Sequence, residues 1–240
     1  MYQRIIEQQN KIFLEEETHT YKLIDSDIEF TSVTEFINTF FEPFDEQKIA
    51  TNLSGKGRYQ NMSVNDILMD WESRRDRGTL VHKELETFIN NLDSDTELSQ
   101  LDLKSKQGIS FLKEKCIGEQ NILFSEVKII SKELQLAGTI DLMLYNKKKN
   151  RIYLIDWKTN TKIKKTGYNK GLVPPVNLME DCSFNRYTLQ LSIYRYMLEK
   201  YYNASVDGLY IVHLKNECYK IMTCDFEQRY VTEMIQSISD

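Results

Sequence analysis

Residues 136–159 read LAGTIDLMLYNKKKNRIYLIDWKT, two apolar runs separated by three lysines that are flanked by asparagines. Runs rich in leucine, isoleucine and tyrosine on either side of a polar turn predict a β-hairpin. Each run contains one acid, Asp141 in the first and Asp156 in the second. A carboxylate in an apolar strand is costly to bury without a cation or hydrogen-bond donors nearby, so both acids are candidate site residues.

The register of this hairpin determines whether the two acids meet. Pairing the strands about the bond between residues 148 and 149 puts Asp141 opposite Asp156. Cross-strand partners point to the same side of a sheet, so this register also brings Lys158 to the face of the acids. A slip of one residue would place the acids on opposite faces. The other face of the hairpin would carry Ile140, Leu142, Leu144, Tyr153, Ile155 and Trp157, with Leu142 opposite Ile155 and Leu144 opposite Tyr153.

Two neighbouring carboxylates and an amine indicate a particular chemistry. Close carboxylates repel each other, and a divalent cation removes that repulsion. Oxygen ligands suit Mg²⁺ or Mn²⁺, which polarises a phosphoryl group and acidifies bound water. Lys158 can hold the attacking water or stabilise charge that builds on the phosphate. We therefore expect metal-dependent hydrolysis of a phosphodiester at Asp141, Asp156 and Lys158, the alternative being a structural ion pair in a β-hairpin.

The segments around the hairpin predict an α/β fold. Helices are expected over residues 63–90, 105–116 and 184–202, and strands over 121–130, 208–214 and 217–223, with a last helix from about Phe226. Ser32 and Glu35 have the spacing of a capping box, which predicts a helix that begins there. This order implies one sheet covered by helices on both faces. We expect residues 1–62 to form an N-terminal extension packed on a core of residues 63–240.

Composition is typical of a globular intracellular protein. Of 240 residues, 41% are hydrophobic and 28% are charged, which argues against a disordered chain. No apolar run approaches the roughly 20 residues that cross a bilayer, and residues 1–10 contain no signal-peptide core. We expect no membrane contact, and a location in a bacterial cytoplasm, a nucleus, a mitochondrion or a viral factory. The four cysteines form no CxxC pair and are interpreted as reduced thiols.

The charge pattern favours contact with phosphates near the hairpin. The net charge is −5, yet residues 147–170 contain nine basic residues and, as their only acid, Asp156. This run continues into an irregular segment, residues 160–183, in which Lys162, Lys164 and Lys165 are candidates for binding nucleic acid. A solvated loop is the alternative interpretation of these lysines.

Five motifs in order resemble a known family. They are Gly-Thr-Leu-Val-His82, Glu126 on a strand, Ala-Gly-Thr-Ile-Asp141, Ile-Asp156-Trp-Lys158-Thr and Gln190-Leu-Ser-Ile-Tyr194. The set is similar to the RecB-like branch of the PD-(D/E)XK nuclease superfamily, which includes mitochondrial and viral or phage exonucleases. The resemblance implies a restriction-endonuclease-like core, in which helices flank a central mixed β-sheet on both faces.

The resemblance also implies roles at the metal. Asp141 and Asp156 would bind the ion, with the backbone carbonyl of Trp157 as a third ligand, and Lys158 would be the catalytic lysine. His82 would be a ligand or lie close to the ion, although a single helix histidine is more often structural.

Further roles follow for residues around the metal. Glu126 would be an additional catalytic acid, and the alternative for it is an exposed strand carboxylate. Gln190 and Tyr194, four residues apart on one helix, would support the site and contact DNA, with an amphipathic helix surface as the alternative.

The resemblance favours a DNA exonuclease in recombination, repair or replication, including viral replication. Its cofactor would be Mg²⁺ or Mn²⁺, and its substrate DNA with a single-stranded segment or a free end. A helicase or recombination partner is possible, because the chain has no GxxxxGK[ST] phosphate loop of its own. Three alternatives stay open: an endonuclease with the same chemistry, RNA as substrate, and a non-catalytic nucleic-acid-binding protein on a nuclease fold.

Overall fold

The computed structural model describes residues 2–15, 20–24, 26–92 and 97–238. Its centre is an eight-stranded mixed sheet in the order β1-β2-β3-β5-β6-β7-β8, with β4 paired to β5 outside this path. The strands are β1 (Ile12–Glu15), β2 (Thr20–Leu23), β3 (Glu29–Ser32), β4 (Asn121–Ser131), β5 (Leu136–Asn146), β6 (Arg151–Lys158), β7 (Val206–Leu214) and β8 (Tyr219–Cys224). The N-terminal strands thus extend the same sheet, and the division at residue 62 stays a prediction.

The hairpin of β5 and β6 has the predicted register. Leu142 lies opposite Ile155, and Leu144 opposite Tyr153. Asn150 closes the turn with a φ of 54°, a left-handed conformation that asparagine tolerates better than most residues. The two candidate acids therefore lie just beyond the last paired residues of this ladder.

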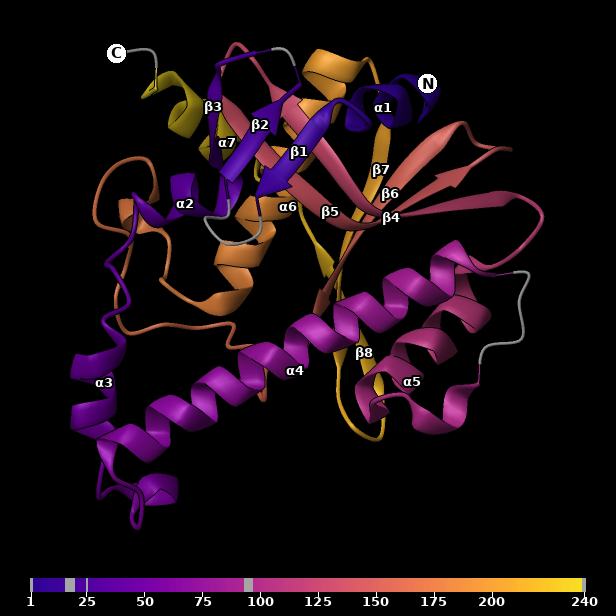
Figure 1. Cartoon of the computed structure of the whole chain (residues 1–240). Coiled ribbons are helices and arrows are strands. Elements are labelled where there is room, and N and C mark those ends of the chain that lie inside the picture. Colours follow the sequence, from indigo (N-terminus) through magenta and orange to yellow (C-terminus); the bar gives the residue numbers. More distant parts are fainter. Residues whose placement is uncertain (1, 16–19, 25, 93–96, 239–240) are drawn as a thin grey trace.

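Helices cover both faces of the sheet, as predicted (Figure 1). Helices α1 (Tyr2–Gln9), α2 (Val33–Asn38), α6 (Ser183–Tyr202) and α7 (Gln228–Gln236) pack on one face, in a core that includes Met143, Leu154 and Ile211. Helices α4 (Val64–Asn90) and α5 (Leu103–Phe111) pack on the other, against Leu142, Ile155 and Val212. We call these the α6 core and the α4 core. Neighbouring strand residues enter different cores because side chains alternate across a sheet.

A fork in the sheet lies beside β5. One edge of β5 pairs with β4 along its length, from Leu136 to Asn146. The other edge pairs with β3 at Leu136 and Ala137, and with β6 only from Leu142 onward. Between Gly138 and Asp141, β5 therefore pairs with neither β3 nor β6. Within this segment Gly138 and Ile140 are buried and Thr139 and Asp141 are half-buried, and Asp141 stands where β3 and β6 diverge.

The strands also reverse their faces at this point. On β5, Leu142 packs in the α4 core but Ile140 packs in the α6 core. Likewise on β4, Leu123 packs toward the α4 core and Val127 lies in the α6 core. Residues an even number apart share a face in a regular strand. The prediction that Ile140 shares a face with Leu142 was therefore wrong, because both strands twist at the intervening acids.

The long helix α4 begins at a capping box and extends beyond the sheet. The Ser63 hydroxyl accepts a hydrogen bond from the Asp66 backbone, and the Asp66 side chain accepts one from the Ser63 backbone. The helix α3 (Glu46–Leu53) packs against the projecting half of α4 (Figure 1). None of the helices in the described ranges is long and apolar enough to cross a membrane.

Candidate active site

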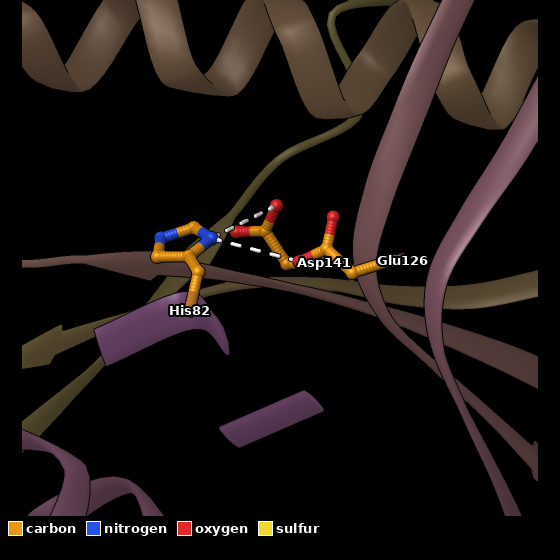
Figure 2. Close-up of side chains that lie close together, drawn as sticks. All are labelled: His82, Glu126 and Asp141. Carbon is orange, nitrogen blue, oxygen red and sulfur yellow. Dashed lines mark ion pairs between the residues drawn. The ribbon is translucent and has the colours of Figure 1, made fainter. Parts of the chain in front are cut away.

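Three side chains converge at the fork from different elements (Figure 2). His82 on α4 directs its Nδ1 toward two carboxylates, 3.7 Å from Glu126 Oε1 and 3.7 Å from Asp141 Oδ1. Glu126 has a φ of 48°, a left-handed conformation that costs a non-glycine residue about 1–3 kcal/mol. Such strain is typical of functional sites, and here it accompanies the reversal of β4 that places the Glu126 carboxylate beside Asp141.

The backbone of Trp157 connects the site residues. Its N–H donates to Asp141 Oδ2 at 2.8 Å, and its carbonyl oxygen lies 3.2 Å from His82 Nε2. The indole is buried in the α4 core with its ring edge-on to Phe111. A hydrogen bond from Nε2 to this carbonyl orients the imidazole and leaves Nδ1 facing the carboxylates. The carbonyl of Trp157 is thus at the site, and its role as a metal ligand stays a prediction.

Asp156 and Lys158 form an ion pair next to these residues. Lys158 Nζ lies 2.7 Å from Asp156 Oδ2 and donates a hydrogen bond to Oδ1 at 2.9 Å. The ammonium also lies 4.4 Å from the centre of the Tyr187 ring, on α6. The Asp156 side chain is only 4% exposed, and the Lys158 ammonium faces both of its oxygens.

The acids are held in an environment that disfavours their charge. Burial raises the pKa of Asp141, and the Glu126 carboxylate adds to the rise, while His82 and Lys158 oppose it. Burial likewise raises the pKa of Asp156 to about 6, despite the opposing effect of Lys158. An added cation would relieve this cost.

The bases of the site are held in their charged forms. Burial lowers the pKa of Lys158, but the carboxylates of Asp156 and Asp141 outweigh it and raise the pKa above its ordinary value. The same balance, with Asp141 and Glu126 as partners, raises the pKa of His82 to about 9. Lys158 therefore keeps its proton. Of the two charged groups in the ion pair, the Asp156 carboxylate is the one whose ionised form burial disfavours on balance.

The donor atoms fit a divalent cation. One atom each from His82, Glu126 and Asp141 lies within 4.8 Å of the others. The two carboxylates suit Mg²⁺ or Mn²⁺, whereas the imidazole is a nitrogen ligand that Mn²⁺ accepts more readily than the oxygen-preferring Mg²⁺. Asp156 is not in this set, because its carboxylate is turned to Lys158. Of the two acids on the hairpin, Asp141 thus lies with His82 and Glu126, and Asp156 pairs with Lys158. Metal binding by Asp156 stays a prediction.

The two residues predicted on α6 lie behind the site. Gln190 Nε2 donates to the Tyr194 hydroxyl at 3.1 Å. Tyr194 is 3% exposed, and its ring lies so close to Gly138 that a Cβ there would be 2.4 Å from it. The deeply covered side chain of Tyr194 supports β5 in this structure, and its predicted contact with DNA stays a prediction. Gln190 is half-buried, and its contact stays a prediction.

An open groove of about 1470 Å³ leads away from His82 and Glu126 along α4. Lys162 and Lys164 line it, whereas Lys165 does not and lies 4.9 Å from the ring centre of Phe184. The basic residues that line it are Arg58, Arg74, Arg75, Arg77, Lys83, Lys104, Lys128, Lys162, Lys164 and Lys215. Among the residues that the structure describes, the acids that line it are Glu46, Glu86 and Glu126. The volume exceeds the roughly 300–1,000 Å³ of a small-molecule site and suits a polymer.

Sequence reasoning missed the part of this groove that α4 provides. Arg74, Arg75 and Arg77 fall within four residues of one helix, a cluster that could have been noticed. Nothing in the local pattern places them opposite Thr161, which accepts a hydrogen bond from Arg74 at 3.2 Å.

Comparison with known families agrees with this geometry. Residues 59–239 match the family model described as the PD-(D/E)XK nuclease superfamily. The match covers all the candidate site residues on α4, β4, β5, β6 and α6. No curated protein matches the chain significantly.

Proposed function

Because the chain belongs to the PD-(D/E)XK nuclease superfamily, whose members are metal-dependent nucleases, we propose that it is a DNA exonuclease of recombination, repair or replication. The observation that carries the proposal is the convergence of His82, Glu126 and Asp141 beside the Asp156–Lys158 ion pair. The substrate would be DNA with a single-stranded segment or a free end. A helicase or recombination protein is the partner we propose.

Mg²⁺ or Mn²⁺ would be held by Asp141, Glu126 and His82, with the Trp157 carbonyl and Asp156 close by. When bound, such an ion polarises the scissile phosphoryl group and lowers the pKa of bound water. The hydrogen bond from the Trp157 N–H orients Asp141, and the one between His82 Nε2 and the Trp157 carbonyl orients the imidazole. The chain thus presents its ligand atoms in a preorganised arrangement.

Lys158 supplies a positive charge that does not depend on the metal. Its ammonium stays protonated and is held between the Asp156 carboxylate and the Tyr187 ring. From there it stabilises negative charge that develops on the phosphate, or holds the attacking water. Asp156 orients this ammonium and so acts on the reaction through Lys158.

Basic residues of the groove would bind the substrate backbone. Lys162 and Lys164 line it close to Asn160 and Thr161. Gln190 on α6 does not line the groove, and we propose that it contacts the strand near Tyr194. Lys165 stands outside the groove lining, and we propose that it contacts phosphates at the entrance. Contacts with phosphates do not depend on the base sequence, and the affinity that they provide falls as the salt concentration rises.

The experiment is cleavage of labelled linear and circular single-stranded DNA by the full chain, with Mg²⁺, Mn²⁺ or EDTA. We expect metal-dependent cleavage of the linear substrate, an intact circle and no cleavage in EDTA. Lys158→Ala should remove the activity, whereas Lys132→Ala, at an exposed lysine of β4's flanking turn, should retain it.

Each alternative has its own outcome. Cleavage of the circle would make the protein an endonuclease, and preferential cleavage of RNA would change the substrate. Binding without cleavage under every metal condition would leave a non-catalytic nucleic-acid-binding protein. The intact set of Asp141, Asp156 and Lys158 argues against that last result.

A further inference from the structure

Two aromatic rings line the groove at the end far from His82 and Glu126. Phe44, which precedes α3, and Trp71, on α4, both line it. Their ring centres are 5.8 Å apart, with planes inclined by 44°. Phe44 is 63% exposed and does not belong to the small core of Ala50, Tyr59 and Ile67 against which Trp71 packs. The ring of Phe44 is therefore a large apolar surface that is exposed to solvent.

The Trp71 ring is held in place from behind. Its Nε1 donates to the Tyr59 hydroxyl at 3.1 Å, and Tyr59 is buried at 5% exposure. The guanidinium of Arg58 stacks on the Tyr59 ring in turn, with its carbon 4.5 Å from the ring centre. A fixed ring loses little conformational entropy when a flat ligand stacks on it.

The surroundings of the pair are basic. Arg75 links the wall of α4 to α3 through Glu46 at 2.7 Å, and Arg74 reaches Thr161 on the opposite wall. Ten basic and three acidic residues line the groove, in a chain whose net charge is −5. Aromatic rings within a positive groove are the combination that binds single-stranded nucleic acid, because unpaired bases expose faces on which rings stack.

We propose that Phe44 and Trp71 form a base-stacking subsite for a single-stranded segment of nucleic acid, an inference that rests on the proposed nuclease function. Trp71 precedes His82 by 11 residues on α4, which is about 16 Å along the helix axis. At about 3.4 Å per stacked nucleotide, no more than about five nucleotides span that distance. The subsite thus selects strands that continue unpaired for several nucleotides beyond the scissile phosphate.

Intrinsic fluorescence tests the subsite without requiring catalysis. The chain has two tryptophans, and Trp157 is 1% exposed, so Trp71 is the one that a bound base can quench. The full chain is titrated in EDTA with oligothymidylates of about 4 to 16 nucleotides and with a blunt duplex. We expect quenching by the longer single strands only. In Trp71→Phe, which keeps a stacking ring, the affinity should be retained and the quenching lost.

The decisive variant is Phe44→Ala, because this exposed side chain is not part of a core. Its affinity for the longer oligothymidylates should fall by about 5-fold or more, the loss expected for one stacked base. The matched control is Met69→Ala, which removes an exposed apolar side chain of α4 that does not line the groove.

Equal affinities of the two alanine variants would overturn the subsite, as would equal quenching by the duplex. Metal-dependent cleavage combined with either result would refute the subsite and keep the nuclease. Quenching with a selective loss in Phe44→Ala, but no cleavage with any metal, would keep the subsite and refute the nuclease.

Discussion

Replacement of Lys158 by methionine should destabilise the protein and abolish its catalysis for separable reasons. The ammonium and the Asp156 carboxylate are 2.7 Å apart, and their side chains are 17% and 4% exposed. Removing one partner of a buried ion pair leaves an uncompensated charge, which costs about 3–5 kcal/mol. For a chain of this size each kcal/mol lowers Tm by about 2–4 °C, so the expected loss is about 6–20 °C.

The pH dependence of this loss has a defined sign. Without metal, the pKa of Asp156 is already raised by burial to about 6, and removal of Lys158 raises it further. A carboxyl whose pKa is higher in the folded state destabilises the fold progressively as pH rises from the unfolded value toward the folded one. The Tm difference between wild type and Lys158→Met, measured by calorimetry in EDTA, should therefore be smallest near pH 4 and largest above pH 7.

A second substitution separates stability from catalysis. Asp156→Asn combined with Lys158→Met removes both charges, so most of the lost stability should return. Nuclease activity should stay at least about 100-fold below wild type in both variants, because the charge proposed to stabilise the phosphate is absent. Lys132→Met, at an exposed lysine, is the matched control. A wild-type unfolding temperature of Lys158→Met at pH 8 would contradict the stabilising role of the ion pair, and normal DNA cleavage by the double variant would contradict the catalytic role of Lys158.

Three further outcomes follow from the site. Gly138→Ala should cost about 1–3 kcal/mol of unfolding free energy, measured in urea, because its Cβ would lie 2.4 Å from the Tyr194 ring; an unchanged midpoint would show that this ring moves freely. With a pKa of about 9, His82 must lose a proton to bind metal through Nδ1. The Mn²⁺ affinity measured by calorimetry should therefore rise by up to about tenfold per pH unit between pH 7 and 9. His82→Asn should remove that rise, and a pH dependence that persists in this variant would exclude His82 as a ligand. The double variant Lys162→Ala/Lys164→Ala should reduce the slope of log affinity against log salt for single-stranded DNA by about 1.4; an unchanged slope would exclude both lysines from phosphate contact.

The hairpin and the helices were predictable because they depend on local patterns. The alternation of side chains along β5 and β6 determines one register, and it is confirmed at Leu142 and Ile155. Likewise Ser32 and Glu35 form the capping box that their spacing predicts, at the start of α2. The helix predicted over residues 63–90 is present as α4, in which Val81 and Leu85 are buried at helical spacing.

The assembly of the site depends on contacts between distant segments. Local alternation is enough to predict that Asp141, Asp156 and Lys158 are neighbours on a hairpin, because a two-residue period relates their side chains. It does not predict that Asp156 turns to Lys158 while Asp141 joins Glu126 and His82, since Glu126 and His82 come from other elements. At Asp141 β3 and β6 diverge and the strands reverse their faces, so that Ile140 packs in the α6 core and Leu142 in the α4 core. These contacts join segments that are distant in the sequence, and no local alternation of residues records them.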